Sequence, residues 1–248
     1  MRRLIAFPCE GETLVGTLDE ADGDTGLLIV SGGNEVRTGS HRGMAQLAAR
    51  LAAQGVPVFR FDRRGIGDST GENLGWSRSA PEVHTAATCF RMEASQLKRL
   101  IALGNCDAAT ALAAFGQAAG LDALILTNPW LSDRGDDGLP PAPAIRARYL
   151  ARLRDPASWT RLPNFRKLFK GVSTLLQKRH EPDHARLFAD LALPATVILA
   201  EGDATALAYK AAMRGTFVHI RTASHSFADA ADELETAILE AIRRYSAA

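Results

Sequence analysis

Cysteine is scarce in this sequence. Cys9, Cys89 and Cys106 are the only three among 248 residues, and no C-x-x-C pair brings two of them together. The spacing therefore gives no basis for a disulfide framework or a zinc site, and it fits a reducing compartment. We expect neither a metal ion nor a cofactor.

An excess of charge of one sign and long apolar runs are lacking as well. The chain carries 29 Lys and Arg against 28 Asp and Glu, a net charge of +1, so nothing electrostatic favours nucleic acid or an anionic membrane as a partner. No apolar run is long enough for a membrane span, and the start, MRRLIAFPCEGE, is too short in apolar residues for a signal peptide. We expect a cytoplasmic protein, whose oligomeric state the sequence does not predict.

What the sequence does contain is an alternation of short apolar runs and helical patterns. With 248 residues and 46% hydrophobic content, it can form one large α/β domain. The predicted strands are 3–7, 13–18, 27–30, 56–61, 100–103, 123–127, 195–200 and 216–220, of which the first two form a hairpin at a sheet edge. Predicted helices at 41–54, 81–91 and 108–115 lie between them. This order predicts a mostly parallel central sheet flanked by helices.

The alternation stops between residues 128 and 193. Pro129, Pro140, Pro141 and Pro143 break the chain at the start of this interval, and helical patterns follow at 145–153 and 165–177. The segment is too long for a simple crossover. We therefore expect a core formed by 1–127 and 194–248, with 128–193 inserted as a helical cap over the carboxyl ends of the strands.

The expected cap is locally basic. Between residues 145 and 179, ten Lys and Arg side chains stand against the single acidic residue Asp155. Two interpretations remain open: a solvated helical face, or a surface that attracts anionic substrates or a partner.

One nucleophilic side chain stands between a predicted strand and a predicted helix. The turn from 104 to 108 reads Gly-Asn-Cys-Asp-Ala. This is the strand–turn–helix context of the nucleophile elbow G-x-S-x-G, with Cys106 at the nucleophile position and Ala108 replacing the last glycine. The residues two before and two after the apex must be small, because helix and strand approach closely there. Taken alone, Cys106 could equally be a buried, inert cysteine.

Two further groups follow strand ends in the order expected for a catalytic triad. Asp203 follows the strand 195–200, and His225 follows the strand 216–220. Taken singly, Asp203 could cap a helix at 204–213, and His225 could be a surface loop residue. Because parallel strands end at one edge of a sheet, we expect both near Cys106, in the chain order nucleophile, acid, histidine.

A polar loop at residues 62–69 follows another predicted strand. We expect Asp62 and Arg64 to be structural, with the Asp62 carboxylate accepting backbone N–H groups of its own glycine-rich loop.

Four segments carry a resemblance to a known family. They are Gly32-Gly33-Asn34, Gly39 to Arg42, Phe61 to Ser69 and the elbow Gly104 to Ala109. They resemble the α/β-hydrolase superfamily and, more narrowly, the exosortase A system-associated hydrolases (hydrolase 1 type), whose genes accompany a bacterial protein-sorting and exopolysaccharide locus. The resemblance covers nearly the whole chain and is weakest in the cap. It implies an α/β-hydrolase fold and a cytoplasmic hydrolase.

These residues together predict acyl transfer on a small-molecule ester or thioester. Cys106 would attack the carbonyl, and His225, oriented by Asp203, would then activate water. Backbone N–H groups of Asp107 and of Gly33 or Asn34 would stabilise the oxyanion, as this fold implies.

Alternatives remain open at this point. With Asp107 as the nucleophile, Asn105 would fall at a position that needs a small residue, which fits poorly. An acyltransferase would keep the acyl-cysteine and replace water by a sugar or amine acceptor, and a non-catalytic binding module would keep only the fold. The Asp107 carboxylate would either oppose thiolate formation or face away and cap its own helix.

Overall fold

The computed structural model describes residues 1–131 and 184–247. The predicted cap helices at 145–153 and 165–177, and the basic residues between 145 and 179, lie outside the described residues.

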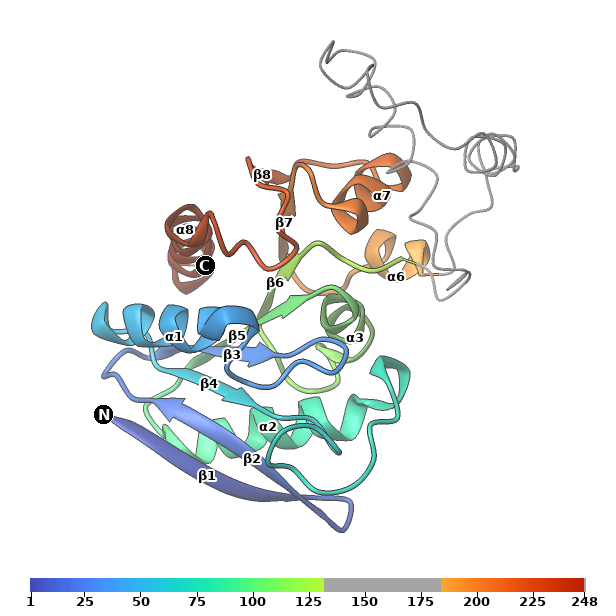
Figure 1. The fold of residues 1–248 in the computed structure, drawn as a ribbon. Coiled ribbons are helices and arrows are strands. Elements are labelled where there is room, and N and C mark those ends of the chain that lie inside the picture. The colour runs from blue at the N-terminus through green and yellow to red at the C-terminus, as the bar shows by residue number, and fades with distance from the viewer. Residues whose placement is uncertain (132–183, 248) are drawn as a thin grey trace.

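Eight strands form one sheet in the described part of the chain (Figure 1). They are β1 (Arg2–Cys9), β2 (Glu12–Asp19), β3 (Thr25–Val30), β4 (Val58–Phe61), β5 (Arg99–Asn105), β6 (Ala123–Thr127), β7 (Ala195–Ala200) and β8 (Val218–Ile220), in the order β1-β2-β4-β3-β5-β6-β7-β8. The pairs β1–β2 and β2–β4 are antiparallel, and all other pairs are parallel. The predicted hairpin at the sheet edge and the mostly parallel sheet are both confirmed.

Helices cover both faces of this sheet. They are α1 (Gly43–Ala53), α2 (Ala80–Glu93), α3 (Asp107–Phe115), α6 (Ala185–Ala189), α7 (Ala204–Ala212) and α8 (Ala231–Ser246), with short 3₁₀ helices η1 (Ser40–Arg42) and η2 (Trp76–Arg78). The helix predicted at 41–54 begins later, because His41 and Arg42 have φ values of 52° and 61°, which no α-helix tolerates. The sequence interpretation did not include α8, although its buried residues recur at helical spacing.

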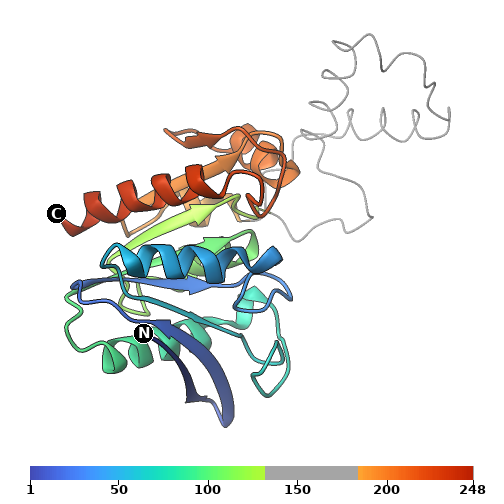
Figure 2. The same ribbon diagram turned by 60° about the vertical axis from the view of Figure 1, so that its left-hand side comes forward.

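The sheet separates two hydrophobic cores. In β3, Leu27 and Ile29 face the core shared with α1 and α8, whereas Leu28 and Val30 face the core shared with α2 and α3. Figures 1 and 2 show α1 and α8 side by side on one face, with α2 and α3 on the other. Because every β3 residue is buried, Leu27 to Val30 form a continuous apolar run rather than an alternating pattern.

Hydrogen bonds of two buried charged side chains, Asp62 and Arg64, hold the loop after β4. Asp62, which is fully buried, accepts the N–H of Asp68 at 3.1 Å and that of Arg37 at 2.6 Å. Arg64 donates to Glu82 of α2 at 2.7 Å and to Glu10 at 2.7 Å. The predicted contact of Asp62 with its own loop is therefore present, and Arg64 ties that loop to α2.

The chain leaves and re-enters the described core at one place. The N–H of His184 donates to the carbonyl oxygen of Leu131 at 2.9 Å, so the two described residues that flank 132–183 are neighbours.

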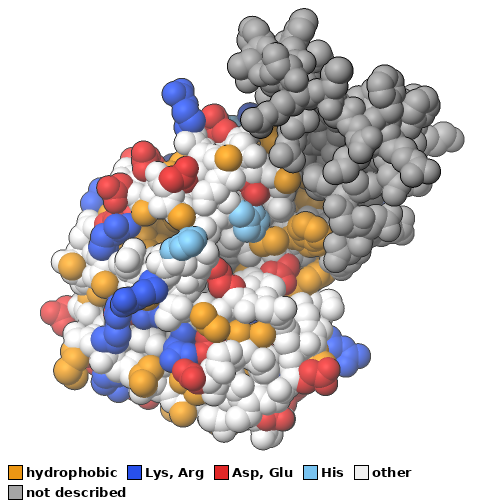
Figure 3. Space-filling model, in the orientation of Figure 1, with side chains coloured by type: hydrophobic (Ala, Val, Ile, Leu, Met, Phe, Trp, Pro, Cys, Tyr) orange, Lys and Arg blue, Asp and Glu red, His pale blue; other side chains and the backbone are white. Residues whose placement is uncertain are grey.

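The surface carries charges of both signs. Figure 3 shows Lys and Arg side chains interspersed with Asp and Glu over the face drawn, as the net charge of +1 leads one to expect. Among the described helices, none combines the length and apolar character that crossing a membrane requires.

Candidate active site

Cys106 lies at the apex of the turn between β5 and α3. Its backbone has φ 57° and ψ −123°, a conformation that L-residues with a Cβ avoid. The turn is held by the Cys106 N–H, which donates to Thr127 of β6 at 3.0 Å, and by the Cys106 carbonyl, which accepts the N–H of Trp130 at 3.2 Å. Strain of this kind persists only where the surroundings impose it, and it is concentrated at functional sites.

The close approach predicted for the elbow is confirmed at Gly104. A Cβ on Gly104 would lie 2.8 Å from the carbonyl carbon of Ala108 and 2.9 Å from the nitrogen of Ala109. Any side chain there would push α3 away from β5. The apex residue is thus Cys106, and Asp107 is the first residue of α3, which disfavours the alternative in which Asp107 attacks.

The structure brings Cys106, His225 and Asp203 together. The Nδ1 atom of His225 lies 3.0 Å from Oδ2 of Asp203. Hydrogen bonds with Asp203 and with Cys106 raise the pKa of His225 from 6.5 to about 10, although burial opposes the charged form. The His225 side chain is 40% exposed, so it remains open to solvent and to a ligand.

Asp203 is ionised as well as buried. Burial favours its neutral form, but hydrogen bonds from His225 and from the backbone N–H groups of Ala206 and Thr205 outweigh that effect and hold its pKa below the usual value. The helix α7 that starts at Ala204 is the one that Asp203 caps. Both sequence interpretations of this residue, helix cap and histidine partner, are therefore met geometrically.

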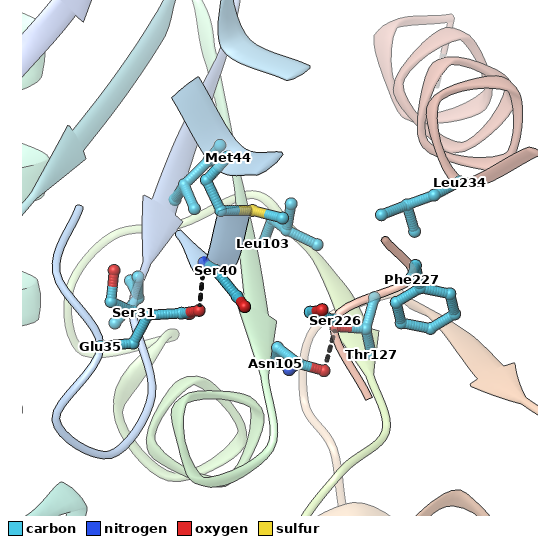
Figure 4. Close-up of a pocket in the computed structure, with 12 residues that line it drawn as sticks. Ser31, Glu35, Ser40, Met44, Leu103, Asn105, Thr127, Ser226, Phe227 and Leu234 are labelled. Carbon is cyan, nitrogen blue, oxygen red and sulfur yellow. Dashed lines mark hydrogen bonds between the residues drawn. The ribbon is translucent and has the colours of Figure 1, made fainter. Parts of the chain in front are cut away.

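A polar network that the sequence interpretation missed fastens the His225 loop to the sheet. Asn128, which is fully buried, donates from Nδ2 to the His225 carbonyl at 3.1 Å and accepts the N–H of Ala200 at 2.9 Å. Asn105 also donates to the His225 carbonyl, at 3.3 Å, and accepts from Thr127 at 2.9 Å (Figure 4). The only sequence signal was the occurrence of two Asn residues at the carboxyl ends of neighbouring strands.

The carboxylate of Asp107 is bound to the loop that follows β3. Its Oδ1 atom accepts the N–H of Gly33 at 2.7 Å, and its Oδ2 atom lies 3.6 Å from Nη2 of Arg63. A Cβ on Gly32 would lie 2.5 Å from Asp107 Oδ1, so the loop can approach the elbow only with glycine at this position. The Gly33 N–H, expected among the oxyanion donors, is thus engaged by a side chain.

The other two cysteines differ from Cys106. Cys9 and Cys89 are buried, whereas Cys106 is half-buried. Burial raises the pKa of Cys9, and it raises that of Cys89 to about 11. Both are therefore neutral thiols at physiological pH, the less reactive form of cysteine.

A small cavity of about 30 Å³ lies next to the elbow (Figure 4). Met44 of α1, Leu103 of β5 and Leu234 of α8 form apolar parts of its wall, and Asn105 and Ser226 are the wall residues adjacent in sequence to Cys106 and His225. A volume of this size accommodates a water molecule rather than an acyl chain. Within residues 1–131 and 184–247, no group of three or more His, Cys, Asp or Glu side chains is arranged to hold a metal ion.

Comparison with family models identifies the class of protein. A model described as "Alpha/beta hydrolase family" matches residues 27–237. The chain therefore belongs to the α/β hydrolase family, and the predicted α/β-hydrolase fold is confirmed. Comparison with the curated proteins gives no match.

Solved structures share this fold at low sequence identity. The structure of the DcsB complex with its substrate analogue aligns with a TM-score of 0.70, at 16% identity over 100% of each chain. The Pyrococcus furiosus esterase Pf2001 aligns with a TM-score of 0.65, at 14% identity over 98% of this chain and 91% of the other. The thioesterase domain from the curacin biosynthetic pathway aligns with a TM-score of 0.60, at 17% identity over 96% and 99%. Identities this low establish the fold alone.

Proposed function

We propose that this protein is a cysteine-dependent esterase or thioesterase that works through an acyl-cysteine intermediate. The observation that carries the proposal is the strained apex residue Cys106 beside His225, whose pKa is raised to about 10 by its contacts with Asp203 and Cys106. A nucleophile next to a histidine that a carboxylate orients is the arrangement that nucleophilic acyl transfer requires.

In the proposed reaction, the Cys106 thiolate attacks the carbonyl carbon of an ester or thioester. The tetrahedral intermediate collapses by breaking the bond to the leaving alcohol or thiol, which takes a proton from His225. His225, now neutral, removes a proton from water, and the resulting hydroxide releases the acyl group as a carboxylic acid and restores the thiolate and the imidazolium. Asp203 keeps the imidazole in one orientation throughout.

The oxyanion of the tetrahedral intermediate needs donors on the side of the elbow that faces the β3 loop. The N–H of Asp107, at the first turn of α3, is one proposed donor, and the loop of Gly33 and Asn34 supplies the other. The helix α3 adds a favourable dipole, because its N-terminus begins directly after Cys106.

Intact-protein mass spectrometry after brief incubation with activated esters tests this proposal. We expect a mass increment of one acyl group on the wild-type protein and none on Cys106→Ala, with several acyl lengths tried. Release of that adduct by water supports hydrolysis, whereas release only by an added amine or sugar would identify an acyltransferase instead. A folded wild-type protein that stays unlabelled at every acyl chain length would contradict the enzyme proposal and favour a binding module.

Two finer assignments rest on sequence alone and are proposed with the function. One is a role beside a bacterial exosortase and exopolysaccharide locus, and the other is a cytoplasmic location. Deletion of the gene should alter surface exopolysaccharide or protein sorting, and cell fractionation should recover the protein with cytoplasmic markers. Normal surface material in the deletion strain would contradict the first assignment.

A further inference from the structure

The feature that points beyond the proposed function is a set of contacts at the carboxyl ends of three neighbouring strands. Arg63 follows β4, Gly33 follows β3, and Asp107 follows β5, and these strands are adjacent in the order β4-β3-β5. Gly33 is held on both sides: its N–H donates to Asp107 Oδ1 at 2.7 Å, and its carbonyl accepts from Arg63 Nη2 at 2.5 Å. We call Asp107, Gly33 and Arg63 the loop clasp.

Asn73 adds to the clasp from a fourth segment. Its Nδ2 atom donates to the Gly33 carbonyl at 3.2 Å and to the side-chain oxygen of Asn34 at 2.9 Å. Arg63 itself is 2% exposed, so its guanidinium is confined to this position by packing as well as by charge. The Gly33 carbonyl therefore has a direction that two donors determine.

The direction of the Gly33 carbonyl also determines where the N–H of Asn34 points. A peptide unit is planar and trans, so the Gly33 carbonyl and the Asn34 N–H, which belong to one unit, point in opposite directions. Because Arg63 and Asn73 draw the carbonyl one way, the Asn34 N–H is aimed the other way. The Gly33 N–H is engaged by Asp107, which leaves Asn34 as the loop donor for an oxyanion.

We propose that Asp107 and Arg63 are positioning residues that hold the β3 loop so that Asn34, rather than Gly33, supplies the loop donor of the oxyanion hole. This inference rests on the proposed acyl-cysteine chemistry. It gives the Asp107 side chain a role: its negative charge, next to the nucleophile, is paired with Arg63 and used to anchor the loop.

Two reactions of Cys106 separate this role from a general structural one. Acylation by an activated ester passes through an oxyanion, whereas alkylation by iodoacetamide is a displacement at carbon and forms none. Loss of the clasp should therefore slow acylation and leave alkylation at least as fast as in the wild type. Removal of an oxyanion donor lowers kcat by about 100- to 1,000-fold, so a misplaced donor should cost roughly 10- to 100-fold.

The experiment compares acylation and alkylation rates in four variants. Asp107→Ala should acylate roughly 10- to 100-fold more slowly, with KM little changed, because only the transition state carries the oxyanion. Asp107→Asn keeps an acceptor for the Gly33 N–H and should recover most of that rate. Asn73→Ala should show a smaller loss in the same direction. The exposed Asp190→Ala, on the loop after α6, serves as the matched control and should equal the wild type.

Each other outcome overturns the inference. Equal losses of acylation and alkylation in Asp107→Ala would place its effect on Cys106 or on the fold. Faster acylation would mean that the carboxylate obstructs a Gly33 donor. An unchanged rate would remove any role for the clasp, whereas a wild-type protein that is never acylated would overturn the proposed function itself.

Discussion

The two oxygens of the Asp203 carboxylate have different partners, and only one of them contacts His225. Oδ2 lies 3.0 Å from Nδ1 of His225, while Oδ1 accepts the N–H groups of Thr205 and Ala206, each at 3.0 Å. The first turn of α7 thus prevents the carboxylate from rotating. It thereby fixes the direction in which Oδ2 points toward His225. Helix capping and orientation of the histidine are two results of one side-chain position.

Substitution of Asp203 should separate these two results. Asp203→Asn keeps an oxygen for the helix cap, so it should lose only the stability that the ionic contact with His225 provides. Its turnover should fall by at least about tenfold, because a neutral amide neither holds the imidazolium nor selects its tautomer. Asp203→Ala should lose the turnover and, in addition, about 0.5 to 2 kcal/mol of stability from the missing cap. Equal unfolding of the two variants in urea would contradict the capping role.

The stability of the protein should depend on pH through His225. Its pKa is raised in the folded state from 6.5 to about 10, so the folded state binds the proton more tightly than the unfolded chain does. This contribution is fully present below about pH 6.5 and is lost as the pH rises through about 10. The difference in unfolding free energy between the wild type and His225→Asn should therefore shrink between pH 6 and pH 10. The largest cause of the shift is Asp203, so the same comparison in an Asp203→Asn background should be flatter; a constant difference across this range would argue against the ionic contact.

Iodoacetamide should distinguish the three cysteines. Cys106 is half-buried and adjoins a protonated imidazole, whereas Cys9 and Cys89 are buried and have raised pKa values. Peptide mapping after a brief exposure should find label on Cys106 long before the other two. The Cys106 rate should fall in His225→Asn, while the slow rates of Cys9 and Cys89 serve as internal controls for unfolding. Equal labelling of all three in the native protein would contradict the proposed nucleophile.

Asn128 should matter for both stability and activity. It is fully buried with φ 42°, and its side chain joins Ala200 of β7 to the carbonyl of His225. Asn128→Ala leaves the Ala200 N–H without its acceptor and should cost about 1 to 3 kcal/mol, besides slowing turnover. Asn128→Gly removes the same hydrogen bonds but tolerates the positive φ, so it isolates the side-chain contribution. If Asn128→Gly unfolded at the same urea concentration as the wild type, the network would carry no stability.

The buried ion pair between Arg64 and Glu82 can be compared with a surface ion pair of the same helix, α2, to test what burial contributes to stability. Their side chains are 9% and 4% exposed, and Nε of Arg64 lies 2.7 Å from Oε1 of Glu82. Glu82→Gln leaves the guanidinium partly unpaired and should cost about 3 kcal/mol or more. Glu93, also in α2, pairs with Arg3 at the surface at 3.0 Å, and Glu93→Gln should cost less than about 1 kcal/mol. Equal losses in urea denaturation would mean that burial of the Arg64 pair adds nothing.

Much of the fold was determined by the sequence alone. The strands predicted at 123–127 and 195–200 are β6 and β7 with those bounds, since a run of apolar residues ended by polar ones specifies a strand buried on both faces. The elbow could be predicted for the same local reason, because Gly104 and Ala108 are close in sequence as well as in space. The late start of α1 could not be predicted, because nothing in the residue types of His41 and Arg42 indicates their left-handed conformation.

Only the tertiary structure decided which side chains serve the site and how. Asp107 and Gly33 are 74 positions apart, and their hydrogen bond exists because β3 and β5 are neighbours in the sheet. Asn128 reaches the His225 carbonyl across 97 positions for a similar reason. Sequence patterns report burial and backbone preference, which are local, whereas the partners of a polar group at a strand end depend on strand order. That order is set by the packing of the whole sheet, so these contacts became visible only with the folded chain.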